Sequence, residues 1–280
     1  MLIGCITALS AIGAALMGIC TEAFDSLAWL WVLPVTFLGS FLLLAGLAFL
    51  VLLIACAVVD PDKPQEKDSK FYRVMTNLCV EAVLTFARVR VTTSGLEQTP
   101  KSGRFLLVCN HLHEADVAIL LHYFRKSQLA FISKQENRDM FLVGKLMPKL
   151  LCQLINREND REALRTIIKC IQLLKDDKVS VAVFPEGYIR PDRKFHQLRP
   201  GVFKIAQKAN VPIVVCTLTG TQTVVKNFLK CKPSHVTLHL LEVLPAEWVA
   251  GKSTVEMAEY IHGIMAQDLG PDYRPAEETP

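Results

Sequence analysis

Residues 105–124 read FLLVCNHLHEADVAILLHYF, and this stretch decides the fold class. An apolar run of strand length, Arg104–Cys109, comes first, and a run of helical character, Val117–Phe124, follows it. The residues between the two runs are polar and include groups that can do chemistry. Because open α/β sheets place their sites where strands end, the stretch predicts a sheet flanked by helices, with a site at one of its edges.

The same alternation of strands and helices continues through most of the chain. Further strands are expected at Val89–Thr93, Leu129–Ser133, Gln153–Asn156, Ser180–Phe184, Pro212–Thr217 and Val236–Leu241, and further helices at Phe71–Phe86, Asp160–Lys175, Val202–Lys208 and Thr254–Gln267. Runs such as VAVF and PIVVC are apolar at nearly every position, which is typical of strands buried on both faces by helices. We therefore expect an α/β fold with a mostly parallel central sheet.

Residues 1–59 have a different composition. They contain no Lys or Arg and only two acids, Glu22 and Asp25. Uncharged runs at about 1–20 and 28–58 are each long enough to cross a hydrocarbon core of ~30 Å. This predicts a transmembrane helical hairpin as membrane anchor (1–59), a polar linker (60–70) and an α/β domain (71–280). A hairpin that dips into one leaflet is the alternative.

Charge outside the hairpin predicts orientation and partners. Lys63, Lys67, Lys70 and Arg73 follow the second run, so the positive-inside rule places the large domain on the cytoplasmic side of the inner membrane. From residue 60 onward, 31 basic residues face 25 acids (27 minus the two above), about +6. This suits anionic lipid or phosphate and falls short of a nucleic-acid-binding composition. The nine cysteines never form CxxC, which predicts free thiols.

The first candidate site is the segment Asn110–Asp116. If His111 precedes the first helical turn, Asp116 can reach back to one ring nitrogen, fix the tautomer and leave the other nitrogen to accept a proton from a hydroxyl. Two alternatives remain open. A His–Asp pair can be an ordinary hydrogen bond at a helix N-terminus, and His111, His113, Glu114 and Asp116 are all potential metal ligands, although the HxHxDH spacing of dinuclear hydrolases is absent.

The second candidate site is Phe184-Pro185-Glu186-Gly187, directly after a predicted strand. Pro185 and Gly187 favour a tight turn, which would present Glu186 to the hydroxyls of an acceptor and Arg190 to a phosphate. Lys134 and Arg157 follow other apolar runs and could converge on the same anionic head group. An ordinary surface turn with solvated cations is the alternative.

Taken in order, NHLHEAD (110–116), SKQE (133–136), LINR (154–157), FPEG (184–187) and VPIVV (211–215) resemble the sequence blocks of the glycerolipid acyltransferase family, which includes the 1-acylglycerol-3-phosphate acyltransferases. The resemblance covers about residues 71–245. It implies that His111 is the general base, Asp116 its orienting partner, and Arg157, Glu186 and Gly187 acceptor-binding residues, with Lys134 assisting.

The resemblance also implies a reaction. An acyl group would pass from acyl-CoA or acyl-acyl carrier protein to the sn-2 hydroxyl of lysophosphatidic acid, giving phosphatidic acid, with no cofactor and no metal. Another lysophospholipid acceptor, a metal-dependent lipid phosphodiester hydrolase and a non-catalytic lipid-binding protein are the alternatives. Two residues rather than one separate FPEG from Arg190, Leu151 replaces a usual glycine and Asn156 a common Asp. These departures concern the acceptor head group more than the reaction.

Overall fold

The computed structural model describes residues 1–63, 65–156, 159–273 and 275. The chain divides into two compact units, Met1–Asp60 and Pro61–Pro280. In the first unit, α1 (Leu2–Cys20) and α2 (Trp29–Ala57) pack against each other, and both are long and apolar enough to cross a membrane. At Gly18 an added Cβ would lie 2.9 Å from Leu33 and from Phe24, so glycine allows the close approach of the two helices there.

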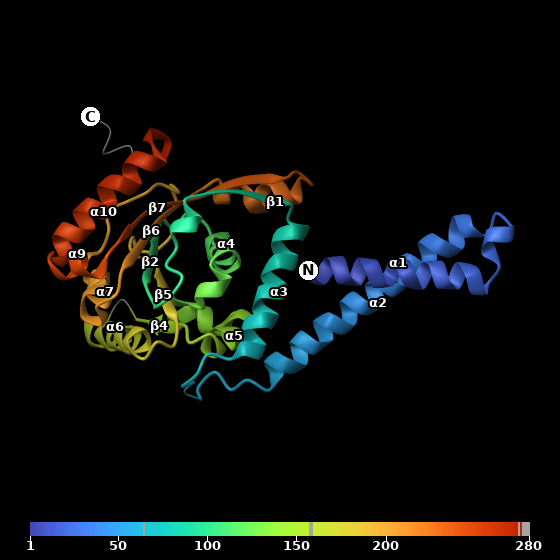
Figure 1. The fold of residues 1–280 in the computed structure, drawn as a ribbon, viewed down its shortest axis with the longest axis horizontal. Helices are drawn as coiled ribbons and strands as arrows, with labels where there is room; N and C mark the ends of the chain where they lie inside the picture. Colours follow the sequence, from blue (N-terminus) through green and yellow to red (C-terminus); the bar gives the residue numbers. More distant parts are fainter. Residues whose placement is uncertain (64, 157–158, 274, 276–280) are drawn as a thin grey trace. The chain divides into compact units, whose positions relative to one another are not determined.

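The second unit is built on a seven-stranded sheet of order β1-β7-β6-β2-β5-β3-β4 (Figure 1). All neighbouring strands pair in parallel except β6 and β7. The strands are β1 (Val89–Ser94), β2 (Leu106–Cys109), β3 (Leu129–Lys134), β4 (Gln153–Ile155), β5 (Ser180–Val183), β6 (Ile213–Thr219) and β7 (Ser234–Leu244). One edge of the sheet, called here the carboxyl edge, therefore holds the ends of β2 to β6 and the starts of β1 and β7.

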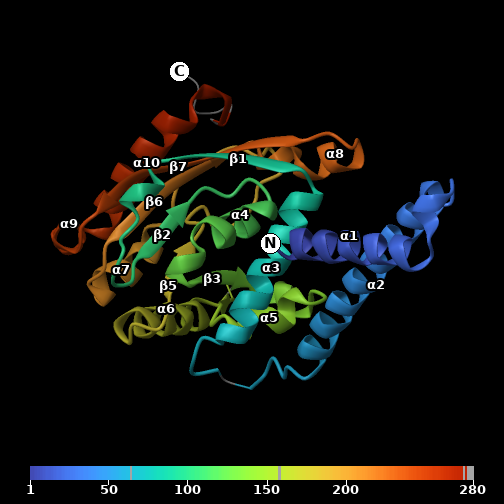
Figure 2. The same ribbon diagram turned by 45° about the vertical axis from the view of Figure 1, so that its right-hand side comes forward.

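Helices cover both faces of this sheet (Figures 1 and 2). They are α3 (Lys70–Phe86), α4 (Ala115–Tyr123), α5 (Val143–Lys149), α6 (Asp160–Lys175), α7 (Lys204–Ala209), α8 (Val224–Leu229), α9 (Ala246–Ala250) and α10 (Thr254–Leu269). Side chains of α6, α7, α9 and α10 share one apolar core, and those of α3, α4 and α8 share another.

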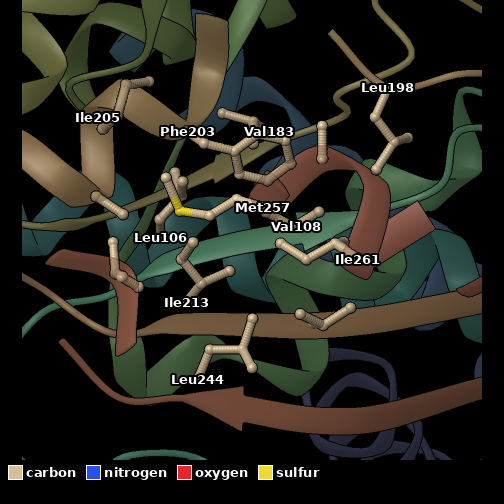
Figure 3. Close-up of a cluster of buried hydrophobic side chains, with 14 of the residues drawn as sticks. Leu106, Val108, Val183, Leu198, Phe203, Ile205, Ile213, Leu244, Met257 and Ile261 are labelled. Atoms are coloured by element: carbon tan, nitrogen blue, oxygen red, sulfur yellow. The ribbon is translucent and has the colours of Figure 1, made fainter. Parts of the chain in front are cut away.

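Successive side chains of β2 point alternately into the two cores. Leu106 and Val108 belong to the first core, which Figure 3 shows, whereas Leu107 and Cys109 belong to the second. All four side chains are fully buried, as a strand covered on both faces requires. Burial of this kind on both faces makes the central strands a rigid base for the segments that follow their carboxyl ends.

The fold-class prediction is confirmed: an α/β unit with a mostly parallel sheet flanked by helices, preceded by two apolar helices. Three short helices, α5, α8 and α9, were not predicted, because five to seven residues show too little of a helical period. The long strand β7 alternates buried and exposed residues at its start, as antiparallel strands with one solvated face do.

Candidate functional site

The candidate site begins where β2 ends. Asn110 is fully buried, its amide nitrogen donates to Leu218 O at 2.8 Å, and its amide oxygen accepts from Leu218 N at 2.7 Å. The side chain thereby continues the pairing of β2 with β6 after the last backbone pair, Cys109 with Cys216. Asn110 thus releases the main chain from the sheet at a fixed point, one residue before His111.

His111 and Asp116 form a hydrogen-bonded pair. Helix α4 begins at Ala115, so His111 precedes the helix, and its Nδ1 lies 2.9 Å from Asp116 Oδ2. The same oxygen accepts from Leu112 N at 2.7 Å and from His113 N at 2.8 Å. Since the Asp116 side chain is fully buried, these donors take the place of water around its charge. A carboxylate held this way fixes the imidazole tautomer with its proton on Nδ1.

The other side of the imidazole is available for chemistry. The ring stacks on Phe184 with centroids 3.9 Å apart and planes 11° apart, and the side chain keeps 17% of its surface exposed. Among the described residues, no hydrogen-bond partner of Nε2 was found. With Nδ1 bound to Asp116, Nε2 is the nitrogen that can accept a proton from a substrate hydroxyl. Burial raises the pKa of the neighbouring Cys109 thiol well above its ordinary value, so Cys109 supplies no thiolate nucleophile.

The Glu186 side chain binds the main chain of the segment that carries His111. Its carboxylate accepts from His111 N at 2.8 Å through Oε1 and from His196 N at 3.0 Å through Oε2. The residue is only 4% exposed, and burial raises its pKa to about 7, against the opposing effect of the two backbone donors. Its carboxylate therefore joins two segments of chain, and both of its oxygens are engaged by the protein.

The FPEG segment forms the turn that brings Glu186 to this place. Gly187 N donates to Phe184 O at 3.0 Å, and Gly187 has a φ of 96°, a conformation that favours glycine. An added Cβ would lie 2.7 Å from Arg199 Nε, so the Arg199 side chain passes over the glycine. Both features explain why glycine occupies the end of this turn.

Several cations surround the turn. Arg193 Nη1 donates to Leu112 O at 2.6 Å, which ties the segment after FPEG to the segment that carries His111. The Arg190 guanidinium lies over the Tyr188 ring, 4.9 Å from its centroid. Lys134 ends β3 at the carboxyl edge and is exposed. These side chains and Arg199 place four cations around the site, in the same segments as the acids Glu114, Asp116, Glu186 and Asp192.

The predicted site residues fare differently. The structure brings His111, Asp116, Glu186 and Gly187 together, and Lys134 and Arg190 lie at the same edge of the sheet; Arg157 falls outside the described residues. Sequence reasoning assigned no individual role to Asn110 or Arg193, and it missed His196 and Arg199 as parts of the site. For Asn110 a signal existed, since a polar residue directly after a buried strand must find a partner for its amide.

The described side chains around His111 are not arranged as a set of metal ligands. In the part of the chain that the structure describes, no group of three or more His, Cys, Asp or Glu side chains is placed to hold one. His113 Nδ1 accepts from Ala115 N at 3.1 Å, and Asp116 Oδ2 is taken by three N–H groups. The side chains weighed as metal ligands are thus mostly engaged within the turn itself.

Comparison with known proteins points to one family. A family model described as "Acyltransferase" matches residues 90–219, which include the His111–Asp116 and FPEG segments. A probable 1-acyl-sn-glycerol-3-phosphate acyltransferase of Mycoplasma pneumoniae is 32% identical over 56% of this chain and 58% of its own length. A 1-acyl-sn-glycerol-3-phosphate acyltransferase of Chlamydomonas reinhardtii is 29% identical over 84% of this chain and 69% of its own. The chain thus spans about three fifths to two thirds of these relatives.

A solved structure shares the fold. The crystal structure of the 1-acyl-sn-glycerophosphate (LPA) acyltransferase PlsC from Thermotoga maritima superposes with a TM-score of 0.60 over 78% of this chain and 86% of its own, at 23% identity. At this level of identity the likeness concerns the architecture.

Proposed function

We propose that this chain is a member of the glycerolipid acyltransferase family and that it transfers a fatty acyl group from a thioester donor, acyl-CoA or acyl-acyl carrier protein, to the sn-2 hydroxyl of lysophosphatidic acid, giving phosphatidic acid. The observation that carries this proposal is the His111–Asp116 pair. Nδ1 of His111 is hydrogen-bonded to Asp116, and Nε2 has no hydrogen-bond partner among the described residues. Such a base activates a hydroxyl of the substrate, so the enzyme itself needs no nucleophile.

The proposed reaction proceeds by direct attack. His111 Nε2 takes the proton of the acceptor hydroxyl as its oxygen bonds to the thioester carbonyl carbon. The resulting imidazolium is stabilised by the Asp116 carboxylate, 2.9 Å from Nδ1. When the tetrahedral intermediate collapses, the C–S bond breaks, and the imidazolium returns its proton to the leaving sulfur. The base is thereby regenerated, and the chemistry requires neither a metal nor an organic cofactor.

The roles of the surrounding residues follow from their contacts. We assign the acceptor phosphate to the cations of the carboxyl edge, Lys134 and Arg190 together with Arg157, because a guanidinium or ammonium group is the natural partner of a phosphate. Glu186 and Gly187 were expected to bind the acceptor directly. Since both Glu186 oxygens accept from backbone N–H groups, we propose that the pair positions the His111 segment instead.

We further propose that residues 1–59 anchor the enzyme in the inner membrane with the α/β unit on the cytoplasmic side. The helices α1 and α2 have 19 and 29 residues and are apolar enough to span a bilayer. The basic residues cluster after α2 and not between the helices, in agreement with the positive-inside rule. A substrate with one acyl chain stays in the bilayer, so an anchored enzyme meets it there.

The deciding experiment measures transfer of labelled acyl groups by the purified protein. Acyl-CoA and acyl carrier protein thioesters are each paired with lysophosphatidic acid and with lysolipids of other head groups. We expect phosphatidic acid from lysophosphatidic acid and a loss of at least about 10³-fold in turnover for His111→Ala, since the base is removed. A preference for another lysolipid would reassign the acceptor.

The same assay separates the other candidate functions. Activity that a chelator abolishes would favour a metal-dependent hydrolase. Lysolipid binding without turnover, equal in wild type and His111→Ala, would mean a non-catalytic lipid-binding protein. Either result would refute the proposed acyl transfer.

A further inference from the structure

A group of apolar side chains projects into solvent where α3 ends and α8 lies. Val83 and Phe86 on α3 are 60% and 73% exposed, and Leu229 on α8 is 76% exposed. The rings of Phe86 and Phe228 are 6.0 Å apart, which joins the two helices into one surface. Large apolar side chains that cluster in solvent usually mark a surface with a partner.

Helix α8 is amphipathic in a way that leaves its apolar stripe uncovered. At about 100° per residue, Val225, Phe228 and Leu229 fall within an arc of about 100°. Lys226 and Lys230 occupy the adjacent arc, whereas Val224 on the other side is buried in the core. Exposed apolar residues bordered by lysines are the pattern of a helix that lies in a membrane interface.

The charged side chains on and around α8 are basic, and on α3 one acid, Glu81, lies two residues before Val83. Lys226, Lys230 and Lys232 are exposed, and Arg88 lies beside them, since its Nη1 donates to Cys231 O at 2.8 Å. Neither residues 82–96 nor residues 220–241 contain an Asp or Glu. We call Val83, Phe86, Val225, Phe228 and Leu229, with these four cations, the α3–α8 surface.

The α3–α8 surface lies at the carboxyl edge of the sheet, which also carries His111. Helix α8 connects the end of β6 to the start of β7, and α3 leads into the start of β1, all at this edge (Figure 2). The strand next to β6 is β2, and His111 is the second residue after β2. A flat partner on the α3–α8 surface would therefore also approach the edge of the sheet that carries His111.

We propose that the α3–α8 surface docks the α/β unit onto the anionic bilayer, its apolar side chains entering the interface and its cations binding lipid head groups. Only residues 58–69 separate α2 from α3, a reach of at most about 40 Å, and α3 adds about 24 Å from Lys70 to Phe86, so this surface stays within about 65 Å of the point where α2 leaves the bilayer. A second copy of the chain fits less well, because a two-fold contact would set these cations against one another.

This inference rests on the proposed membrane anchorage but not on acyl transfer. Docking at the carboxyl edge would let a lysolipid pass from the bilayer to His111 without crossing water. Substrate entry from the membrane would then depend on residues that never touch the substrate.

A pair of matched positions tests the docking. Val225 on α8 and Val255 at the start of α10 are both 52% exposed, but Val255 follows β7 at the opposite edge of the sheet. A photo-cross-linking amino acid is placed at either position in the full chain, which is reconstituted in phosphatidylcholine vesicles with or without phosphatidylglycerol. Yields of cross-linked phospholipid are then compared by mass.

We expect position 225 to cross-link phospholipid at least about fivefold more than position 255, and more so with phosphatidylglycerol. Each basic residue near an anionic surface strengthens binding by about fivefold, so Lys226→Glu/Lys230→Glu/Lys232→Glu should bring position 225 down to the level of position 255. Equal yields at the two positions in the native chain would overturn the proposal. Cross-links from position 225 to another copy of the chain would also overturn it, in favour of self-association.

Activity provides an independent readout. The triple variant should transfer acyl groups normally in detergent micelles, where no bilayer has to be reached, and more slowly in anionic vesicles. Equal slowing in micelles and vesicles would contradict a docking role. Because cross-linking is read without turnover, it decides on docking even if the acyl-transfer assay fails.

Discussion

Replacing Asp116 by Asn removes one charge from the pair while it preserves much of the geometry. Oδ2 accepts all three hydrogen bonds of this side chain, from His111 Nδ1, Leu112 N and His113 N. An amide oxygen in that position can accept the same three bonds. The amide nitrogen would then take the place of Oδ1, which is buried and has no partner among the described residues. The fold should therefore survive, with the Nδ1-protonated tautomer of His111 retained.

The expected loss follows from the charge alone. During the reaction the imidazolium and the carboxylate would be separated by about 4 Å between charge centres, an interaction of about 4 kcal/mol at an effective dielectric constant of about 20. Loss of that interaction in the transition state corresponds to about 10³-fold in kcat. Complete loss of the correct tautomer would cost more, about 10⁴-fold. We expect a fall near 10³-fold with KM little changed, because Asp116 does not face the substrate.

A second His–Asp pair provides the control. His196 Nε2 lies 2.8 Å from Asp192 Oδ2, and Asp192 is partly exposed at the same edge of the sheet. Asp192→Asn makes the identical chemical change at a histidine to which no proton transfer is assigned, and it should retain activity within a few-fold. Steady-state transfer to lysophosphatidic acid is measured for both variants, with folding checked by circular dichroism. A decrease in kcat of less than tenfold for Asp116→Asn would refute the assignment of His111 as the base. An equal decrease in kcat for Asp192→Asn would refute it as well.

Two further predictions concern stability. The folded chain holds the Glu186 proton up to about pH 7 whereas an unfolded Glu releases it near 4.5, so this contribution to stability is full below pH 4.5 and is lost as the pH rises through 7. Relative to the Glu186→Gln variant, whose side chain does not titrate, the free energy of unfolding of the wild type should fall by about 3 kcal/mol between pH 4.5 and pH 8. Urea unfolding of both proteins at the two pH values measures this difference. The same change with pH in both proteins would contradict a buried carboxyl group at Glu186. Asn110→Ala leaves Leu218 N and Leu218 O without their partner inside the protein. The substitution should therefore lower the free energy of unfolding by about 3 kcal/mol. A loss under about 1 kcal/mol would mean that the two hydrogen bonds of Asn110 contribute little to stability.

The sequence predicted the fold because its central strands carry an unambiguous pattern. The run at 180–184 and the run at 212–217 are apolar at nearly every position, which is typical of strands buried on both faces. The direction of β7 could not be predicted. Its antiparallel pairing with β6 arises because α8 leads the chain back into the sheet at the same edge at which β6 ends. A six-residue helix leaves no pattern that indicates this return.

The site was predictable only where its residues are close in sequence. His111 and Asp116 are five residues apart, so the hydrogen bond between them could be anticipated from the position of the helix start. Glu186 binds the backbone N–H of His111 across 75 residues, and nothing in the sequence around Glu186 indicates which main-chain group it binds. For that reason Glu186 was expected to face the substrate, whereas the structure gives both of its oxygens to the protein.

The segment that carries the base is held by side chains and not by regular secondary structure. Between the end of β2 and the start of α4, Asn110 is bound to β6, His111 N to Glu186, and Leu112 is held at its N–H by Asp116 and at its carbonyl by Arg193. These partners come from β6, from the segment that follows β5 and from α4, so several independent contacts fix the position of the imidazole. A base held this firmly needs little reorganisation when charge develops on it. The departures at Leu151 and Asn156 and in the spacing between FPEG and Arg190 can then alter the acceptor that is bound while the proton transfer at His111 stays the same.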